Sequence, residues 1–159
     1  MRVEQLMTKQ VRSCRPDDTL ERAAQLMWDH DCGSLPVCAG NDASRTVGII
    51  TDRDIAMCGM FHPKPLRDLP VSEAMARNPR TCRPTDGIED AEKIMREAQI
   101  RRLPVVDDDG RLIGMISHAD LAREAARERA RPSPRVTETE IGDTLAAICT
   151  ASSRRVAAA

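Results

Sequence analysis

The chain carries the same pattern twice, and this duplication limits its fold more than any other feature of the sequence. The two copies are 68 residues apart over most of their length. Further along each copy the spacing falls to 66 residues, which aligns residues 48–54 with residues 114–120. Because a repeat of this length is a compact unit, the sequence predicts two half-domains related by pseudo-twofold symmetry. The residues shared at the 68-residue offset are Met7, Cys14, Arg15, Pro16, Glu21, Ala23, Met27 and Leu35-Pro36-Val37, matching Met75, Cys82, Arg83, Pro84, Glu89, Ala91, Met95 and Leu103-Pro104-Val105.

Each copy predicts the element order β-α-β-β-α, which places the chain in the α/β (α+β) class. Apolar side chains recur at helical spacing from Leu20 and again from Ile88. An extended stretch precedes each helix and ends at a proline, Pro16 or Pro84. The strands joined by the helix are expected to be parallel, and the pair joined by a short polar loop antiparallel. The later strands are expected at 35–38 and 103–106 and then up to Ile50 and Ile116, with turns at 39–45 and 107–111.

The duplication also sets the expected domain boundaries. Residues 1–61 form the first copy, 62–70 a linker, and 71–125 the second copy. Residues 126–159 are expected to hold the end of a basic helix and a flexible tail. Within the tail region, Ile141 to Cys149 predicts one or two amphipathic turns after a break at Pro132-Ser133-Pro134, and we interpret this stretch as a contact for a partner or for a second chain.

The composition excludes several classes of protein. The 159 residues are 41% hydrophobic and 31% charged with net charge −1, and no stretch has the roughly 18 consecutive apolar residues of a membrane span. The first residues lack the apolar core of a signal peptide, so we expect a cytoplasmic protein. One Trp, one Phe and no Tyr leave few platforms for stacking bases, which argues against nucleic-acid binding.

The six cysteines do not suggest a metal site, because none forms a Cys-x-x-Cys pair and the three histidines are scattered. One pair of cysteines, Cys14 and Cys38, could still lie close together, since each is expected at the end of one of two neighbouring parallel strands. They are a disulfide candidate and a redox switch if their Cα atoms lie within about 7 Å. A reducing cytoplasm favours free thiols instead.

The sequence resembles a tandem pair of cystathionine β-synthase (CBS) domains, the arrangement called a Bateman module. The resemblance rests on the Leu-Pro-Val strand, the run Gly-Ile-Ile-Thr-Asp-Arg-Asp at residues 48–54 and the duplication itself, and it covers about residues 1–125. The short chain is also similar to stand-alone bacterial CBS proteins of the mycobacterial hypoxic response type. The resemblance implies that the two domains pack through their sheets. It also implies that an adenosine-containing ligand such as AMP, ADP, ATP, NAD or S-adenosylmethionine binds in a cleft between the repeats.

The Gly-x-x-Thr-x-x-Asp pattern has two interpretations. A glycine, Gly48 or Gly114, lets a ligand approach the strand closely, and the next helix start offers free N–H groups. The hydroxyl and carboxylate that follow would hold a ribose, a role that the resemblance favours for Thr51 and Asp54 and also for Ser117 and Asp120. The same spacing is also that of a helix-capping box, and spacing alone favours the cap.

Three arginines are candidates for contacting phosphate: Arg53, Arg101 and Arg102. Arg101 and Arg102 directly precede Leu103, where nucleotide-binding CBS domains often carry phosphate-contacting side chains. The matching positions in the first copy are Gly33 and Ser34, so we expect the two copies to bind ligand unequally. The alternative is that all three arginines are solvated surface charges.

No nucleophile, P-loop or dinucleotide-binding pattern supports catalysis, so we expect no enzyme and no required cofactor. The leading hypothesis is a regulatory protein, expected to be a homodimer, that senses an adenosine-containing ligand and signals to an unidentified protein partner. The alternative is a ligand-free structural or interaction module in which the Thr and Asp pairs only cap helices. A thiol switch through Cys14 and Cys38 is compatible with either.

Overall fold

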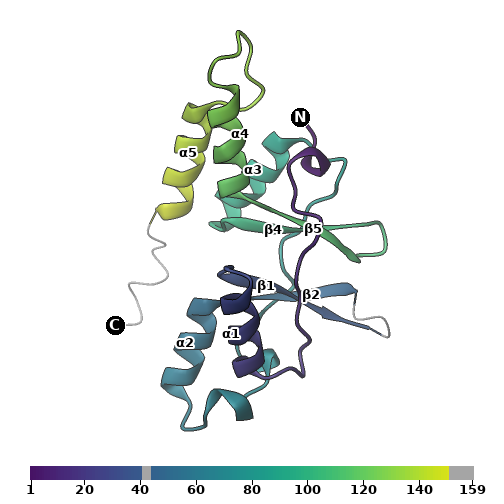
Figure 1. The fold of residues 1–159 in the computed structure, drawn as a ribbon, viewed down its shortest axis with the longest axis vertical. Coiled ribbons are helices and arrows are strands. Elements are labelled where there is room, and N and C mark those ends of the chain that lie inside the picture. The colour runs from purple at the N-terminus through teal and green to yellow at the C-terminus, as the bar shows by residue number, and fades with distance from the viewer. Residues whose placement is uncertain (41–43, 151–159) are drawn as a thin grey trace. The chain divides into compact units, whose positions relative to one another are not determined.

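The computed structural model describes residues 1–40 and 44–150, and these form two compact units (Figure 1). Of these, unit 1 contains residues 1–8, 80–105 and 115–150, and unit 2 contains residues 9–40, 44–79 and 106–114. Residues 41–43 of the expected first turn and the expected flexible tail 151–159 lie outside the described residues.

Unit 2 is built on a three-stranded sheet in the order β1-β2-β3, with α1 and α2 side by side on one of its faces (Figure 1). All neighbouring strands of this sheet are antiparallel. Its core lies between the sheet and the helices and includes Leu20, Met27, Val37, Ile50 and Ile55. The elements are α1 (Leu20–Asp29), β1 (Ser34–Ala39), β2 (Arg45–Thr51), α2 (Asp52–Phe61), the 3₁₀ turns Leu66–Asp68 and Val71–Glu73, and β3 (Ala76–Arg77).

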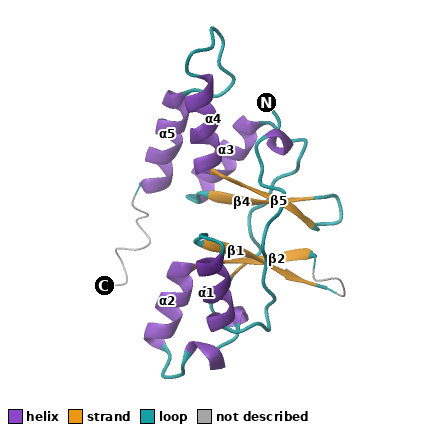
Figure 2. Ribbon diagram, in the orientation of Figure 1, coloured by secondary structure: helices purple, strands orange, loops and turns teal. Residues whose placement is uncertain are grey.

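Unit 1 repeats this plan with two strands and three α-helices (Figure 2). Its core joins the first residues of the chain to the second copy, because Val3 is as fully buried as Met95 and Leu103. The elements are the 3₁₀ turn Val3–Gln5, α3 (Ile88–Ala98), β4 (Arg102–Val106), β5 (Leu112–Ser117), α4 (His118–Glu128) and α5 (Glu138–Cys149). The end of β4 at Val106 and the first half of β5, residues 112–114, are grouped with unit 2.

The predicted fold class and element order are confirmed in both copies. The extended stretch before each helix is reduced to a single bridge, and each bridge is parallel, Cys14 with Val37 and Cys82 with Val105. The hairpin of β1 and β2 is antiparallel, as expected from its short loop. The pattern of apolar residues was therefore sufficient to predict how the chain is organised locally.

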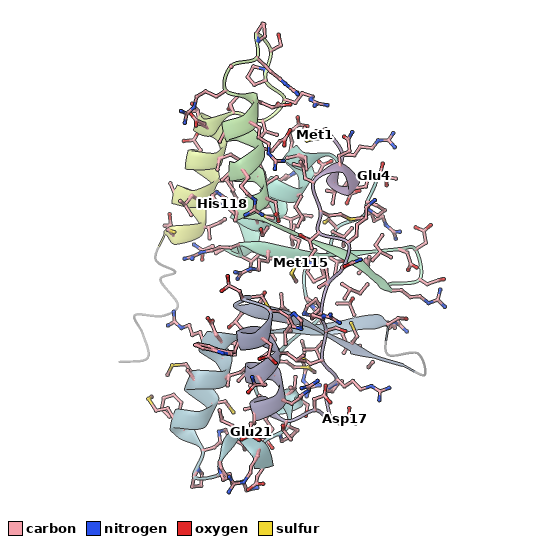
Figure 3. The ribbon with its side chains drawn as sticks, viewed as in Figure 1. Met1, Glu4, Asp17, Glu21, Met115 and His118 are labelled. Carbon is pink, nitrogen blue, oxygen red and sulfur yellow. The ribbon has the colours of Figure 1, made fainter. Side chains whose placement is uncertain are left out.

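The compact units are not the contiguous copies of the sequence. Residues 1–8 pack in unit 1 with the second copy, where the Val3 N–H donates to the Asp86 carbonyl at 3.0 Å and Thr8 bridges Met115. Figure 3 labels Met1 and Glu4 of this segment and Met115 of β5. The stretch around Val71 begins the second copy of the sequence but packs in unit 2 with the first copy, where the Val71 N–H donates to the Asp18 carbonyl at 2.8 Å. Each copy thus gives its first segment to the other. The sequence boundaries at residues 62–70 stay a prediction.

The helix α5 extends the second copy beyond the duplicated pattern. It packs against α3 and α4 and buries Ile141, Thr144 and Ile148. It is longer than the one or two turns that the sequence predicts. It begins at Glu138, where Thr137 as the N-cap and Glu140 as the third helical residue form a complete capping box.

Candidate functional site

The predicted site of the first copy lies at the N-terminus of α2, where β2 ends at Thr51. The Asp54 carboxylate oxygen Oδ2 accepts hydrogen bonds from the Thr51 N–H at 2.9 Å and from the Thr51 hydroxyl at 2.7 Å. The Asp54 N–H in turn donates to the Thr51 hydroxyl at 3.2 Å. Both hydrogen bonds to the Asp54 carboxylate use Oδ2, and its other oxygen, Oδ1, has no hydrogen-bond partner among the described residues.

The second copy repeats this arrangement at the N-terminus of α4. The Asp120 Oδ2 accepts from the Ser117 N–H at 2.8 Å and from the Ser117 hydroxyl at 2.6 Å. Here the other oxygen, Oδ1, is paired with the Arg123 guanidinium. The Arg123 side chain of this pair is 64% exposed, whereas the Asp120 side chain is 12% exposed.

Both pairs are therefore capping boxes, and the capping interpretation of the sequence is confirmed. A third capping box, Thr137 with Glu140, begins α5 and lies outside the duplicated pattern. The ribose role of Thr51, Asp54, Ser117 and Asp120 remains a prediction. The free N–H groups and dipole at each helix start suit an anion or a polar ligand in addition to the cap.

The close approach at Gly48 is made by the protein itself. A Cβ atom built there would lie 2.9 Å from the Ala76 carbonyl oxygen on β3 and 2.9 Å from the Met75 sulfur. The absent side chain is thus explained by strand packing, and Gly48 needs no ligand to account for it. The role of Gly114 remains a prediction.

Gly33, the residue before β1, lies next to the N-terminus of α2, and Arg101, the residue before β4, lies next to the N-terminus of α4. In unit 1 the His118 N–H, the first of α4, donates to the Arg101 carbonyl at 2.9 Å, and in unit 2 the Asp52 N–H donates to the Gly33 carbonyl at 3.3 Å. The backbone therefore brings Arg101 beside the Ser117–Asp120 cap and brings Gly33, which has no side chain, beside the Thr51–Asp54 cap.

Arg101 and Arg53 are exposed and Arg102 is half-buried. Within residues 1–40 and 44–150, none of the three guanidinium groups has an ion-pair partner among the recorded salt bridges. They are free to meet an anion, and whether they contact phosphate remains a prediction.

An open pocket of about 360 Å³ lies in unit 2 beside the start of α2. Its walls combine apolar residues with two carboxylates, Asp31 and Asp52. The sequence did not predict this pocket, because its lining residues come from two separate stretches, 24–33 and 52–55, that only the packing of α1 against α2 brings together. The apolar walls are formed by Ala24, Met27, Trp28 and Ile55.

All six cysteines are free thiols in the structure. The predicted neighbours Cys14 and Cys38 lie on adjacent chain segments, since the Cys38 N–H donates to the Cys14 carbonyl at 2.8 Å. Burial is the largest cause that raises the pKa of Cys14, to about 12, and burial likewise raises the pKa of Cys38. Both thiols are therefore protonated and weakly reactive at neutral pH. Their pairing remains a prediction.

Two further properties concern only the described part of the chain. In it, no three His, Cys, Asp or Glu side chains gather as ligands for a metal ion. Nor does any helix there combine the length and apolar character that crossing a membrane requires.

Known proteins share both the sequence pattern and the fold. A profile of the CBS domain family matches residues 3–58 and 71–127. The chain is 38% identical over 120 residues to the CBS domain-containing protein YhcV of Bacillus subtilis, a match that covers 76% of this chain and 82% of YhcV. It is 35% identical over 106 residues to hypoxic response protein 1 of Mycobacterium tuberculosis, covering 67% of this chain and 72% of that protein.

The fold matches a solved CBS domain pair, that of protein MJ0100 in complex with 5′-methylthioadenosine and S-adenosyl-L-methionine. The TM-score is 0.69 at 26% identity, and the match covers 77% of this chain and 94% of the other. The family profile matches both copies of the duplicated pattern, including the two capping boxes. The chain therefore belongs to the CBS domain family as a tandem pair of CBS domains.

Proposed function

We propose that the chain is a non-catalytic regulatory protein of the cytoplasm that binds an adenosine-containing ligand at its helix N-termini and passes occupancy to a separate protein chain. The candidate ligands are AMP, ADP, ATP, NAD and S-adenosylmethionine. We further propose that it acts as a homodimer. The observation that carries the ligand proposal is the repeated hydroxyl and carboxylate at the starts of α2 and α4, with the Asp54 Oδ1 unpartnered.

The two helix starts are proposed to differ in what they bind. Beside α4, the guanidinium groups of Arg101 and Arg102 supply the positive charge that phosphate oxygens require. Beside α2, the matching positions are Gly33 and Ser34. There the nearby pocket carries the carboxylates of Asp31 and Asp52. We therefore expect phosphorylated nucleotides to favour α4, and an adenosyl ligand without phosphate to favour α2.

The cap geometry itself favours a second candidate function. Because both carboxylates already accept two hydrogen bonds each from their own helix start, the pairs are explained without any ligand. The chain would then be a structural or interaction module. Cys14 and Cys38 would give such a module a thiol switch only if oxidation brought their sulfur atoms together.

A thermal-shift titration with the five candidate ligands distinguishes these functions. A ligand present at 100 times its dissociation constant stabilises the folded state by about 2.7 kcal/mol, which for a chain of this size is a shift of several degrees. We expect a saturable rise in Tm for at least one ligand, and its loss in Asp54→Ala or Asp120→Ala. No rise with any ligand supports the interaction module instead.

The control must separate ligand contact from helix capping. Removing a capping side chain costs about 1 kcal/mol in any case, or about 2–4 °C in Tm. Glu140→Ala removes the same kind of box from α5, where no ligand is proposed, and should lower the Tm of the free protein while leaving the ligand-induced rise intact. Asp54→Glu should keep the cap, because Glu is the usual residue of a capping box, and still weaken binding by moving the carboxylate.

A further inference from the structure

The contact that holds α5 against α3 and α4 of unit 1 has a polar residue in the middle of an apolar seam (Figure 1). The side chains that α5 buries are those of Ile141, Thr144 and Ile148. Thr144 lies between the two isoleucines and is fully buried. Because a buried hydroxyl requires hydrogen-bond partners, the groups opposite Thr144 determine how firmly α5 docks.

The group opposite Thr144 on α3 is a buried carboxylate. Glu92 is only 4% exposed. The Thr144 hydroxyl donates to the Glu92 Oε1 at 3.3 Å, which is long for a hydroxyl donor, and it accepts a hydrogen bond from the Arg96 guanidinium at 2.9 Å. None of the salt bridges recorded within residues 1–40 and 44–150 involves Glu92. An ionised carboxylate here is therefore buried without an ion pair, which is a costly arrangement.

Groups on all three helices face Glu92, but burial has the largest effect on its pKa and raises it above the ordinary value of 4.5. Arg96 on α3 and the Thr144 hydroxyl on α5 act to lower this pKa, as does His118 on α4. Glu140 on α5 acts to raise it further through like charge. The neutral form of Glu92 thus suits the docked arrangement better than the ionised form.

The fold of the repeat does not require a carboxylate at this position. At the 68-residue offset Glu92 corresponds to Ala24 on α1. The helix α5 has no counterpart in the first copy, where β3 follows the second helix after two 3₁₀ turns. The carboxylate therefore occurs only in the copy that carries α5. This pairing indicates that Glu92 serves the docking of α5 and not the folding of α3.

We propose that α5 is a proton-sensitive latch, which docks firmly on α3 and α4 while Glu92 is protonated and loosens when Glu92 ionises. A protonated carboxyl shares a hydrogen bond with Thr144 without placing a charge in the core. An ionised carboxylate is stabilised by water, which it reaches when α5 moves away from α3. The proposal gives the chain a second input, the proton, and it does not depend on ligand binding.

The direction of the pH effect follows from linkage between docking and protonation. An acid whose pKa is higher in the docked state than in water takes up a proton on docking. Docking of α5 is therefore strongest below pH 4.5, the ordinary pKa of the carboxyl, and weakens as the pH rises through the raised pKa of Glu92, whose main cause is burial.

The test measures the local opening of α5 in the full chain as a function of pH. Hydrogen exchange of the backbone amides in residues 141–149 is followed from pH 5 to pH 8, with each rate divided by the intrinsic rate at that pH. Because one linked proton changes the docking equilibrium by up to about tenfold per pH unit, we expect the protection of α5 to fall by at least about fivefold. The amides of β4, which exchange only through wider unfolding, should change less.

Three variants assign the effect to Glu92. Glu92→Gln keeps the size of the side chain but does not ionise, and its α5 protection should not depend on pH. Glu97→Gln makes the same change at an exposed position of α3 and should keep the wild-type response. Histidine side chains titrate in the same pH range, and the His118 Nε2 lies 3.0 Å from the Ile141 carbonyl oxygen (Figure 3). His118→Gln should nevertheless keep the wild-type response.

Carbon-13 NMR of the Glu92 carboxyl provides a measurement on the wild type alone. Its titration midpoint should lie above pH 4.5 and coincide with the loss of α5 protection. The latch is overturned by a midpoint at or below 4.5, by wild-type protection that does not change with pH, or by a fall that is equal in α5 and β4. A fall that survives Glu92→Gln, or that disappears in His118→Gln, also overturns it.

Discussion

At the scale of single residues, Glu128 shows how much one buried carboxylate can organise. Its side chain is fully buried at the end of α4. It accepts hydrogen bonds from the Arg135 Nε at 3.1 Å and from the Val136 N–H at 3.2 Å, and it pairs with Arg131. Because these partners lie three to eight residues further along, Glu128 fixes the turn that directs α5 back onto its neighbours. Its spacing matched no motif, so the sequence did not predict this role.

Glu128 predicts a specific dependence of stability on pH. Desolvation by burial acts to raise its pKa, but the hydrogen bonds from Arg135 and Val136 outweigh it and hold the pKa below the ordinary value of 4.5. A carboxyl whose pKa is lower in the folded state stabilises that state above its unfolded pKa and loses this contribution as the pH falls. Glu128→Gln should therefore unfold at lower urea concentration than wild type at pH 7, and the difference should shrink below pH 4.5.

The control for this prediction is Glu138→Gln, because Glu138 is half-exposed and paired with Arg129 at the surface. Its effect on the urea midpoint should be small at both pH values. If Glu128→Gln instead lost as much stability at pH 3.5 as at pH 7, its contribution would be packing and not charge.

At the scale of elements, the local pattern of the sequence was enough to predict the helices of the duplicated part, but it did not predict how α5 packs. The helical spacing of apolar residues and the spacing of the capping residues predicted the helices that begin at Leu20 and Ile88, because each of these signals lies within a single element. The docking of α5 depends on contacts such as that of Thr144 with Glu92, 52 residues apart. The candidate site likewise has one part that the sequence predicted and one part that it did not. Spacing predicted both capping boxes, but the pocket beside Trp28 arises from packing between helices.

The docking of α5 can be measured through its apolar side. Ile148 is buried and Leu145 is 41% exposed on the same helix. Ile148→Ala should destabilise the chain by about 2–4 kcal/mol, through lost burial and the cavity left behind. Leu145→Ala should cost less than about 0.5 kcal/mol, as surface substitutions do. Urea unfolding at equilibrium gives both values, and equal losses would mean that α5 is not docked by its Ile148 side in solution.

At the scale of the whole molecule, the exchange of first segments predicts which fragments fold. Residues 9–79 contain the complete main part of unit 2, whereas residues 1–61 lack the segment around Val71 that completes its core. We expect the 9–79 fragment to unfold cooperatively on heating, followed by circular dichroism, and the 1–61 fragment to show no cooperative transition. Cooperative unfolding of the 1–61 fragment would show that the exchanged segment is dispensable.

The exchange also bears on how such a chain could have arisen. A single ancestral copy would have carried its own first segment and, with this geometry, would have had to give that segment to another molecule. It would have been complete only as an intertwined pair of identical polypeptides. Duplication and fusion of its gene would have joined that pair into one polypeptide without inventing a new contact. The two halves now differ: the second carries Arg101, Arg102 and the helix α5, and the first carries Gly33, Ser34 and the exposed Trp28.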